Sequence, residues 1–220
     1  MSETITKAND GKDTEVGRIF LADDEPEVRD AIAFMMQVEG LDCQAFATPG
    51  ALLEHLGPHH RGCVLLDVRM PGMNGLELHQ HLQEKGVSMP VIFISGHADI
   101  GIAVRAVQAG ALDFLEKPFN NECLLEKIRN ALELDAERWQ SDHRKVDVEN
   151  RLATLTPRER EVMEGLLEGK LNKLIADDLS ISVRTVEIHR ANVLKKLEAR
   201  NSSELVRLVL STDAYRDWLL

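Results

Sequence analysis

The chain has 220 residues, of which 44% are hydrophobic and 29% charged, which suits two ordinary globular domains and excludes a chain dominated by disorder. Residues 1–17 are polar and no run of about eighteen apolar residues follows, so we expect neither a secretory signal nor a membrane span and place the chain in the cytoplasm. The formal net charge of −11 arises in residues 1–138, which hold 12 Lys and Arg against 23 Asp and Glu, whereas residues 139–220 hold 14 of each. A balanced second part can still gather basic residues on one face, so nucleic acid is not excluded as its partner.

The first part of the chain alternates short apolar runs with stretches of helical period, after a tail at residues 1–17 that we predict to be disordered. The predicted strands are Arg18–Ala22, Cys43–Ala47, Cys63–Leu66, Val91–Ile94 and Ala111–Leu115. The predicted helices are Pro26–Glu39, Pro49–Leu56, Gly75–Lys85, Ile100–Ala109 and Asn120 to about Trp139. Apolar strands joined by helices predict a flavodoxin-like, doubly wound α/β domain over residues 18–134, with a five-stranded parallel sheet covered on both faces. In this architecture the ligand crevice lies at the carboxyl ends of the strands.

Polar residues follow four of the predicted strands at the point where each strand ends. Asp23 and Asp24 follow the first strand, Asp67 the third, Ser95 the fourth and Lys117 the fifth. Three carboxylates in one crevice repel each other unless a cation lies between them, and an all-oxygen set suits Mg²⁺. We therefore predict a magnesium and phosphoryl site, with Asp67 as nucleophile and with Ser95 and Lys117 on phosphoryl oxygens. The predicted metal ligands are Asp23, Asp24, Asp67 and the backbone carbonyl of Arg69. Taken singly, each acid of the first pair is more simply explained as a helix cap.

These motifs, taken together over residues 18–134, resemble the receiver domain of two-component response regulators. The resemblance implies that a histidine kinase transfers a phosphoryl group to Asp67 with Mg²⁺ bound, followed by slow self-dephosphorylation. It also implies that Ser95 and Phe114 are switch positions, that the Lys117–Pro118 bond is cis, and that the fourth helix and fifth strand form a face for homodimer pairing. Many relatives have Tyr where this chain has Phe114, so a switch here acts through packing, and an ordinary core aromatic explains this residue equally well.

After residue 134 the pattern is entirely helical. Residues 135–153 are rich in charge and lack Gly and Pro, so we predict a helical linker. Residues 154–220 are predicted to form a small all-α domain, because Thr156-Pro157-Arg158-Glu159 has the sequence of a capping box and four stretches of helical period follow. The predicted helices are Pro157–Leu167, Asn172–Leu179, Arg184–Leu197 and Ser203–Leu210.

The second and third of these helices, with the short Ser180-Ile181-Ser182 connection, have the outline of a helix-turn-helix. On the third helix, Val186, Val193 and Leu197 form a stripe that we expect to face the core, while the opposite face is polar and cationic. The window Arg184–Arg200 holds five basic residues against two acidic ones, a net of +3 in a domain whose total is zero. We therefore favour a DNA-binding face over an ordinary solvated helix surface.

From about Leu155 to Leu210 the chain resembles the LuxR-type (NarL/FixJ-type) helix-turn-helix domain, through the segments LTPREREVM, NKLIA and RTVEIHRANVLKKL. The resemblance implies contacts with DNA phosphates or groove edges from Lys173, Arg184, Thr185, His189, Asn192 and Lys195. Candidates for contact with base edges are Glu187, Ile188 and Ala191. Of these, the glutamate can accept from cytosine N4 and the isoleucine can touch a thymine methyl group.

Four features of the helical part have simpler structural explanations. We expect His189 to make a structural hydrogen bond and Arg190 to extend to solvent or to an acid on a neighbouring helix. The acidic pair Asp177-Asp178 is expected to point away from the DNA backbone. The last helix, Ser203–Leu210, is a dimer contact by resemblance and serves core packing as well.

Cys43, Cys63 and Cys123 are odd in number and lie far apart in apolar surroundings. Neither a disulfide framework nor a zinc site has that spacing. We expect three reduced thiols in packed positions, with no redox or metal role.

Together the two parts resemble a FixJ-type response regulator, which implies a phosphorylation-promoted homodimer that binds paired half-sites in double-stranded promoter DNA and, with RNA polymerase as a further partner, activates transcription. Inhibition of DNA binding by the unphosphorylated receiver is an alternative form of the same control. A Mg²⁺-dependent phosphohydrolase is disfavoured because Arg69 stands where its general acid is expected and no cap-sized insertion exists. A ligand-sensing LuxR-type regulator is disfavoured because Trp139, Tyr215 and Trp218 all lie outside the predicted sheet. We expect no enzyme activity beyond the receiver's own phosphoryl chemistry and no membrane partner.

Overall fold

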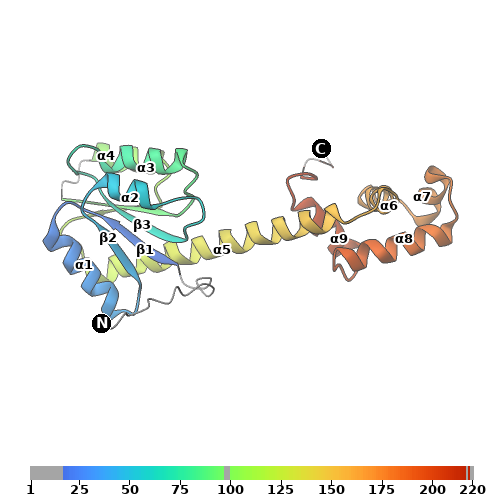
Figure 1. The fold of residues 1–220 in the computed structure, drawn as a ribbon, viewed down its shortest axis with the longest axis horizontal. Helices are drawn as coiled ribbons and strands as arrows, with labels where there is room; N and C mark the ends of the chain where they lie inside the picture. The colour runs from blue at the N-terminus through green and yellow to red at the C-terminus, as the bar shows by residue number, and fades with distance from the viewer. Residues whose placement is uncertain (1–16, 97–99, 217, 219–220) are drawn as a thin grey trace, which may run out of the picture. The chain divides into compact units, whose positions relative to one another are not determined.

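The computed structural model describes residues 17–96, 100–216 and 218 and divides into two compact units, residues 1–138 and 139–220 (Figure 1). The tail predicted at residues 1–17 lies outside the described residues except for Gly17. Among the described helices, none has the length and apolar character required to cross a membrane.

The first unit is built on one parallel sheet of five strands in the order β2-β1-β3-β4-β5, which confirms the predicted doubly wound fold. The strands are β1 Arg18–Ala22, β2 Cys43–Phe46, β3 Gly62–Asp67, β4 Val91–Ser95 and β5 Asp113–Glu116. Pairing is in register along the carboxyl ends, where Ala22 lies beside Leu66 and Asp67 lies beside Ile94. The chain therefore delivers the residues that follow β1, β3, β4 and β5 to one edge of the sheet.

Helices cover both faces of this sheet, with α2, α3 and α4 on one face and α1 and the first part of α5 on the other (Figure 1). Local sequence explains where several of them begin. Thr48 caps α2 through a hydrogen bond from the N–H of Ala51, and Asn74 and Glu77 form a reciprocal capping box on α3. The bounds are α1 Pro26–Val38, α2 Pro49–His55, α3 Gly75–Glu84, α4 Ile100–Gln108 and α5 Asn121–Ala153.

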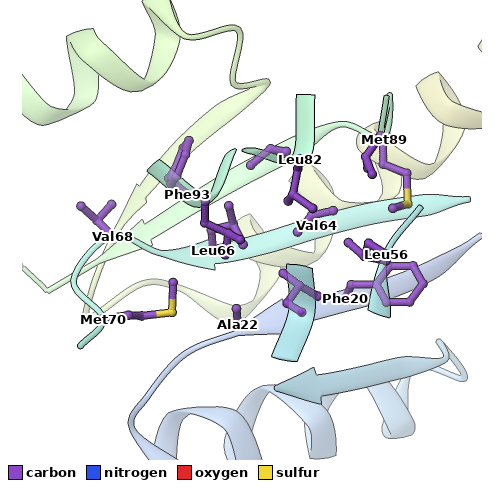
Figure 2. Close-up of a cluster of buried hydrophobic side chains, with 14 of the residues drawn as sticks. Phe20, Ala22, Leu56, Val64, Leu66, Val68, Met70, Leu82, Met89 and Phe93 are labelled. Atoms are coloured by element: carbon purple, nitrogen blue, oxygen red, sulfur yellow. The ribbon is translucent and has the colours of Figure 1, made fainter. Parts of the chain in front are cut away.

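The central strand β3 supplies side chains to two separate cores, as expected from a strand of period two that is buried on both faces. Val64 and Leu66 point into the cluster under α2, α3 and α4, where Figure 2 shows them beside Phe93 and Leu82. Cys63 and Leu65 belong to the opposite cluster, beneath α1 and α5. All six residues of β3 are buried, which explains why its sequence is apolar up to the final aspartate.

The fifth strand begins two residues later than predicted. The predicted run started at Ala111, but the N–H of that residue bonds the carbonyl of Ala106 and closes the end of α4. Gly110 has a φ of +87° there, the left-handed conformation that a glycine adopts without steric cost. Pairing with β4 starts only at Asp113, which lies opposite Ile92.

The second unit packs the end of α5 together with four shorter helices around one core. The helices are α6 Pro157–Leu167, α7 Asn172–Leu179, α8 Val183–Lys196 and α9 Ser202–Leu210. The capping box of Thr156 and Glu159 starts α6 as its sequence indicates. Val148 and Leu152, which lie in the segment predicted as a linker, are buried in this core, so the last two turns of α5 are part of the second unit's packing.

The three cysteines are free thiols in buried or half-buried positions. Burial raises the pKa of the Cys43 thiol to about 11, and it raises the pKa of the Cys63 thiol further. Both are therefore protonated and unreactive at neutral pH, in keeping with the packing role expected for them.

His79 on α3 is a polar residue in an apolar environment. It is 4% exposed, its ring meets Phe93 edge-on at a centroid distance of 5.6 Å, and its buried Nδ1 has no hydrogen-bond partner among the described residues. Burial lowers the pKa of this imidazole, so the folded first unit favours the neutral form. His79 thus lowers the stability of the fold increasingly as the pH falls below the ordinary histidine pKa of about 6.5.

Replacing this residue, as His79→Leu, should increase the free energy of unfolding of the first unit by about 1–3 kcal/mol, because an unsatisfied buried nitrogen is removed at similar side-chain volume. Since the unfolded state binds the extra proton, the gain should be larger at pH 5.5 than at pH 7.5. Scanning calorimetry of the full chain at the two pH values measures both effects. A gain that is identical at the two values would contradict the assignment of a neutral buried imidazole.

Candidate functional site

The four predicted strand-end positions meet at the carboxyl edge of the sheet. Asp23 follows β1, Asp67 ends β3 and Ser95 ends β4, and all three are buried. Lys117 follows β5, and its N–H bonds the carbonyl of Ser95 at 2.8 Å, which continues the β4–β5 pairing by one residue. The order of the strands therefore places two carboxylates, a hydroxyl and an ammonium in one pocket.

The Lys117 ammonium lies between the two buried carboxylates. Its Nζ is 2.8 Å from Asp23 Oδ2 and 2.9 Å from Asp67 Oδ1, and its side chain is only 13% exposed. A third carboxylate, that of Glu25, approaches the same Nζ at 3.2 Å from the solvent side. The peptide bond between Lys117 and Pro118 is cis, as the resemblance implied. The pocket thus holds an excess of negative charge around one fixed cation.

Burial alone would lower the pKa of Lys117, but the hydrogen bonds with Asp23 and Asp67 outweigh it and raise the pKa, so the ammonium stays charged. Burial raises the pKa of the Asp67 carboxyl, and the hydrogen bond from Lys117 opposes that shift. The second oxygen of Asp67 accepts the N–H of Arg69 at 2.6 Å. Asp67 is therefore an anchored carboxyl whose Oδ1 is held by a cation, which suits a nucleophile that must later share that cation with a phosphoryl group.

The remaining predicted metal ligands are arranged differently. Asp24 is half-buried and lines a neighbouring hollow together with Arg69, Met70 and Arg105. In the ranges that the structure covers, no three acidic, histidine or cysteine side chains converge closely enough to hold a metal ion as they stand. Asp23 and Asp67 nevertheless supply adjacent carboxylate oxygens, the donor type that Mg²⁺ prefers. These two residues fit the ion, and a rotation of the Asp24 side chain from its hollow would be required to complete the carboxylate set.

Glu25 was absent from the predicted site, although it contacts Lys117. The residue is the N-cap position of α1, directly before Pro26, and its side chain makes no capping hydrogen bond. The signal was available as a third acid after Asp23 and Asp24, but an acid at a helix start is ordinary and gives no indication of a partner 92 residues away.

The two predicted switch positions lie on neighbouring strands. Ser95 is 1% exposed at the end of β4. Phe114 on β5 is half-buried, pairs in register with Phe93, and packs against the core beneath α4. Both explanations of Phe114, a packing aromatic and a switch residue, are compatible with this position.

The predicted recognition helix α8 presents the expected faces. Val186, Val193 and Leu197 are buried in the core of the second unit. On the opposite side the exposed residues are Arg184, Glu187, Ile188, Ala191, Asn192 and Lys195, with Lys173 exposed on α7. Ile188 is 54% exposed, so its side chain is accessible for contact with thymine methyl groups. Thr185 and His189 are half-buried at the margins of this face.

Two expectations on α8 are wrong. His189 was expected to make a structural hydrogen bond, but its buried Nδ1 has no partner among the described residues. Arg190 was expected to reach solvent or an acid, but its guanidinium donates to two neutral oxygens, Asn172 Oδ1 at 3.1 Å and Ser202 Oγ at 2.9 Å. Both partners are the first residues of helices, α7 and α9, so this arginine joins three helices and, within the described part of the chain, does so through neutral partners.

Two family descriptions match the chain. Residues 19–129 match "Response regulator receiver domain", and residues 153–209 match "Bacterial regulatory proteins, luxR family". The first covers the strand-end pocket and the second covers α6 to α9 almost completely. The two matches correspond to the two units of the structure.

Similar proteins cover nearly the whole chain. The transcriptional regulatory protein FixJ of Azorhizobium caulinodans is 43% identical over 87% of this chain and 91% of its own length, and FixJ of Bradyrhizobium diazoefficiens is 40% identical over 93% and 100%. Among solved structures, the response regulator StyR is 38% identical with a TM-score of 0.80, covering 89% of this chain and 98% of that one. Full-length FixJ from B. japonicum is 41% identical with a TM-score of 0.56, covering 89% and 96%.

Removing the cation of the strand-end pocket, as Lys117→Met, should reduce the free energy of unfolding of the first unit by about 3–5 kcal/mol at pH 7.5, because two buried carboxylates lose their partner. This loss of unfolding free energy should become smaller towards pH 5.5, since the unpaired carboxylates in the folded variant have raised pKa values and take up protons. Hydrogen exchange of the β3 and β4 amides measures the change within this unit. A deficit independent of pH would show that Lys117 acts by packing rather than by charge.

Proposed function

Because the chain belongs to the response regulators that join a receiver domain to a LuxR-type DNA-binding domain, we propose that phosphorylation of Asp67 by a histidine kinase controls binding of the second unit to promoter DNA. Membership makes the protein a FixJ-like transcription regulator rather than a classical enzyme. The observation that carries the proposal is the anchored Asp67 beside Lys117 at the edge of the sheet.

In the proposed transfer, an oxygen of Asp67 attacks the phosphorus of a phosphohistidine on the kinase. The phosphorus–nitrogen bond breaks as the new phosphorus–oxygen bond forms, and the imidazole leaves. Lys117 then pairs with a phosphoryl oxygen while retaining Asp23, and the Ser95 hydroxyl donates to another phosphoryl oxygen. The aspartyl phosphate is later lost slowly by hydrolysis, which ends the signal.

Mg²⁺ is the cofactor proposed for this pocket. Receiver domains as a family bind it at their acidic pocket. Here the carboxylates of Asp23, Asp24 and Asp67 and the carbonyl of Arg69 would hold it. When bound, the ion neutralises negative charge on the transferring phosphoryl group.

Phosphorylation is proposed to favour a homodimer. Ser95 and Phe114 stand on β4 and β5, the strands that precede and follow α4 in the chain, so movement of the hydroxyl towards a phosphoryl group would alter the surface next to that helix. On α4 itself, Ile100 is 83% exposed, and Val104 and Val107 are also exposed, which is an apolar surface suited to pairing. A shift from 1:99 to 99:1 requires roughly 5.5 kcal/mol, which a divalent ion, a phosphoryl group and a repacked interface can supply together.

The dimer is proposed to present two α8 helices to half-sites about one helical turn apart in double-stranded DNA. Lys173, Arg184, Thr185, His189, Asn192 and Lys195 contact phosphates or groove edges in this proposal, and Glu187, Ile188 and Ala191 contact bases. RNA polymerase is the proposed further partner, with activation as the outcome. Release of the second unit from inhibition by the unphosphorylated receiver is the alternative route to the same control.

The proposal is tested by incubating the full chain with Mg²⁺ and acetyl phosphate and comparing wild type with Asp67→Asn by intact mass and by size-exclusion elution. We expect a phosphoryl adduct and a shift towards dimer in the wild type alone. Glu77→Gln, a change at an exposed acid in the capping box of α3, is the matched control and should behave as wild type.

Three other results would change the conclusion. An adduct on the Asp67→Asn variant would place the acceptor elsewhere. An adduct on Asp67 without a dimer shift would favour release of the DNA-binding unit over pairing. Absence of any adduct would contradict the phosphoacceptor role.

A further inference from the structure

The end of α5 and the end of α8 cap each other. Arg151, in the last turn of α5, donates from Nη1 to the carbonyl of Leu197, the C-cap residue of α8, at 3.4 Å. Lys196, the last residue of α8, donates from Nζ to the carbonyl of Thr154, the residue directly after α5, at 3.0 Å. The last carbonyls of a helix lack partners within the helix, and a cation there also meets the negative end of the helix dipole. Each helix thus satisfies the C-terminus of the other.

Both cations are held in place by acids. Arg151 pairs with Glu198 Oε2 at 2.8 Å and, through its other terminal nitrogen, with Asp147 Oδ2 at 2.7 Å. Lys196 pairs with Glu159 Oε2 at 2.6 Å, and this hydrogen bond lowers the pKa of Glu159 to about 2. The glutamate therefore remains charged throughout the physiological range. Each cation therefore has a backbone carbonyl and at least one carboxylate as partners, unlike an isolated surface ion pair.

The backbone after α8 indicates why an external cap is needed. Glu198 has a φ of +52°, a left-handed conformation that is usually taken by glycine at this position. The turn lets the N–H of Ala199 reach the carbonyl of Leu194 at 2.9 Å, but among the described residues no backbone N–H donates to the carbonyl of Leu197. Arg151 donates to that carbonyl. It also pairs with the carboxylate of Glu198, the residue in the left-handed conformation.

Packing joins the same two helices. Val148 and Leu152 of α5 share a core with Val186, Val193 and Leu197 of α8. α5 is also the covalent connection between the two units. The last turns of α5 and the recognition helix α8 therefore change direction together only if the contacts between these two helices are kept.

We propose that Arg151 and Lys196 are positioning residues that fix the recognition helix α8 to the end of α5, so that a phosphorylation-promoted dimer presents its two α8 helices at one defined half-site spacing. The inference rests on the proposed function, since it assumes paired half-sites. Neither residue belongs to the predicted DNA-binding set. Both act through the placement of α8 and not by touching a base.

The test uses the full chain, phosphorylated with acetyl phosphate and Mg²⁺, and a DNA duplex that the wild type selects from a random-sequence pool. Affinity is measured for this duplex, for a single half-site, and for a duplex with about 5 base pairs, half a helical turn, inserted between the half-sites. The variants are Arg151→Met, Lys196→Met and both together. Arg144→Met is the matched control, because Arg144 is an exposed residue of the same helix that donates to Gln140 on that helix.

We expect the insertion to weaken wild-type binding by on the order of tenfold or more, a usual size for coupling between sites. In the double variant the penalty should fall below about threefold, while single half-site affinity remains equal to that of the control. Arg151→Lys retains the charge but lacks the guanidinium fork that reaches both Asp147 and Leu197, so the insertion should weaken its binding by an intermediate factor. This variant replaces Arg151→Met in the test if Arg151→Met does not fold.

An unchanged insertion penalty in folded variants would overturn the proposal, as would a wild type that tolerates the insertion. The variants could instead lose affinity for the single half-site and melt at a lower temperature while the insertion weakens their binding as much as it weakens the wild type. That result would show that the two residues act only on stability. Failure of the wild type to select any duplex would instead contradict the proposed function itself.

Discussion

The ion pairing of one lysine with two buried aspartates is the interaction on which the pocket depends. Asp23 is fully buried and Asp67 almost so, and neither carboxylate has another cation in contact among the described residues. Lys117 pairs with both carboxylates, but one ammonium does not neutralise two carboxylates. The carboxylate of Glu25 adds further negative charge beside it. A divalent cation would compensate the excess negative charge of such a site, and together with Lys117 it would offset the further negative charge that a phosphoryl group on Asp67 adds.

Much of this arrangement was predictable because it depends on local patterns. Strands buried on both faces read as apolar runs, and a polar residue directly after such a run lies at the carboxyl edge of the sheet, which is how Asp67, Ser95 and Lys117 were found. The burial of one stripe of α8 followed from helical period alone. The start of β5 was misplaced by two residues because Gly110 and Ala111 finish α4 instead.

The features that escaped prediction are contacts between residues far apart in the chain. The pairing of Glu25 with Lys117, the neutral partners of Arg190, and the mutual capping of α5 and α8 have no local signature, since each depends on how helices pack. The segment after residue 134 looked like a linker because its charges outnumber its apolar residues. Two buried side chains, Val148 and Leu152, are enough to make its last turns part of the DNA-binding unit's core.

The central claim is that a phosphoryl group on Asp67 controls DNA binding by α8. The most direct measurement is the affinity of the full chain for a duplex selected from a random-sequence pool, before and after treatment with acetyl phosphate and Mg²⁺, in wild type and in Asp67→Asn. We predict an increase of about tenfold or more in the wild type and none in the variant. An equal increase in both proteins, or a fully phosphorylated wild type whose affinity is unchanged, would contradict the claim.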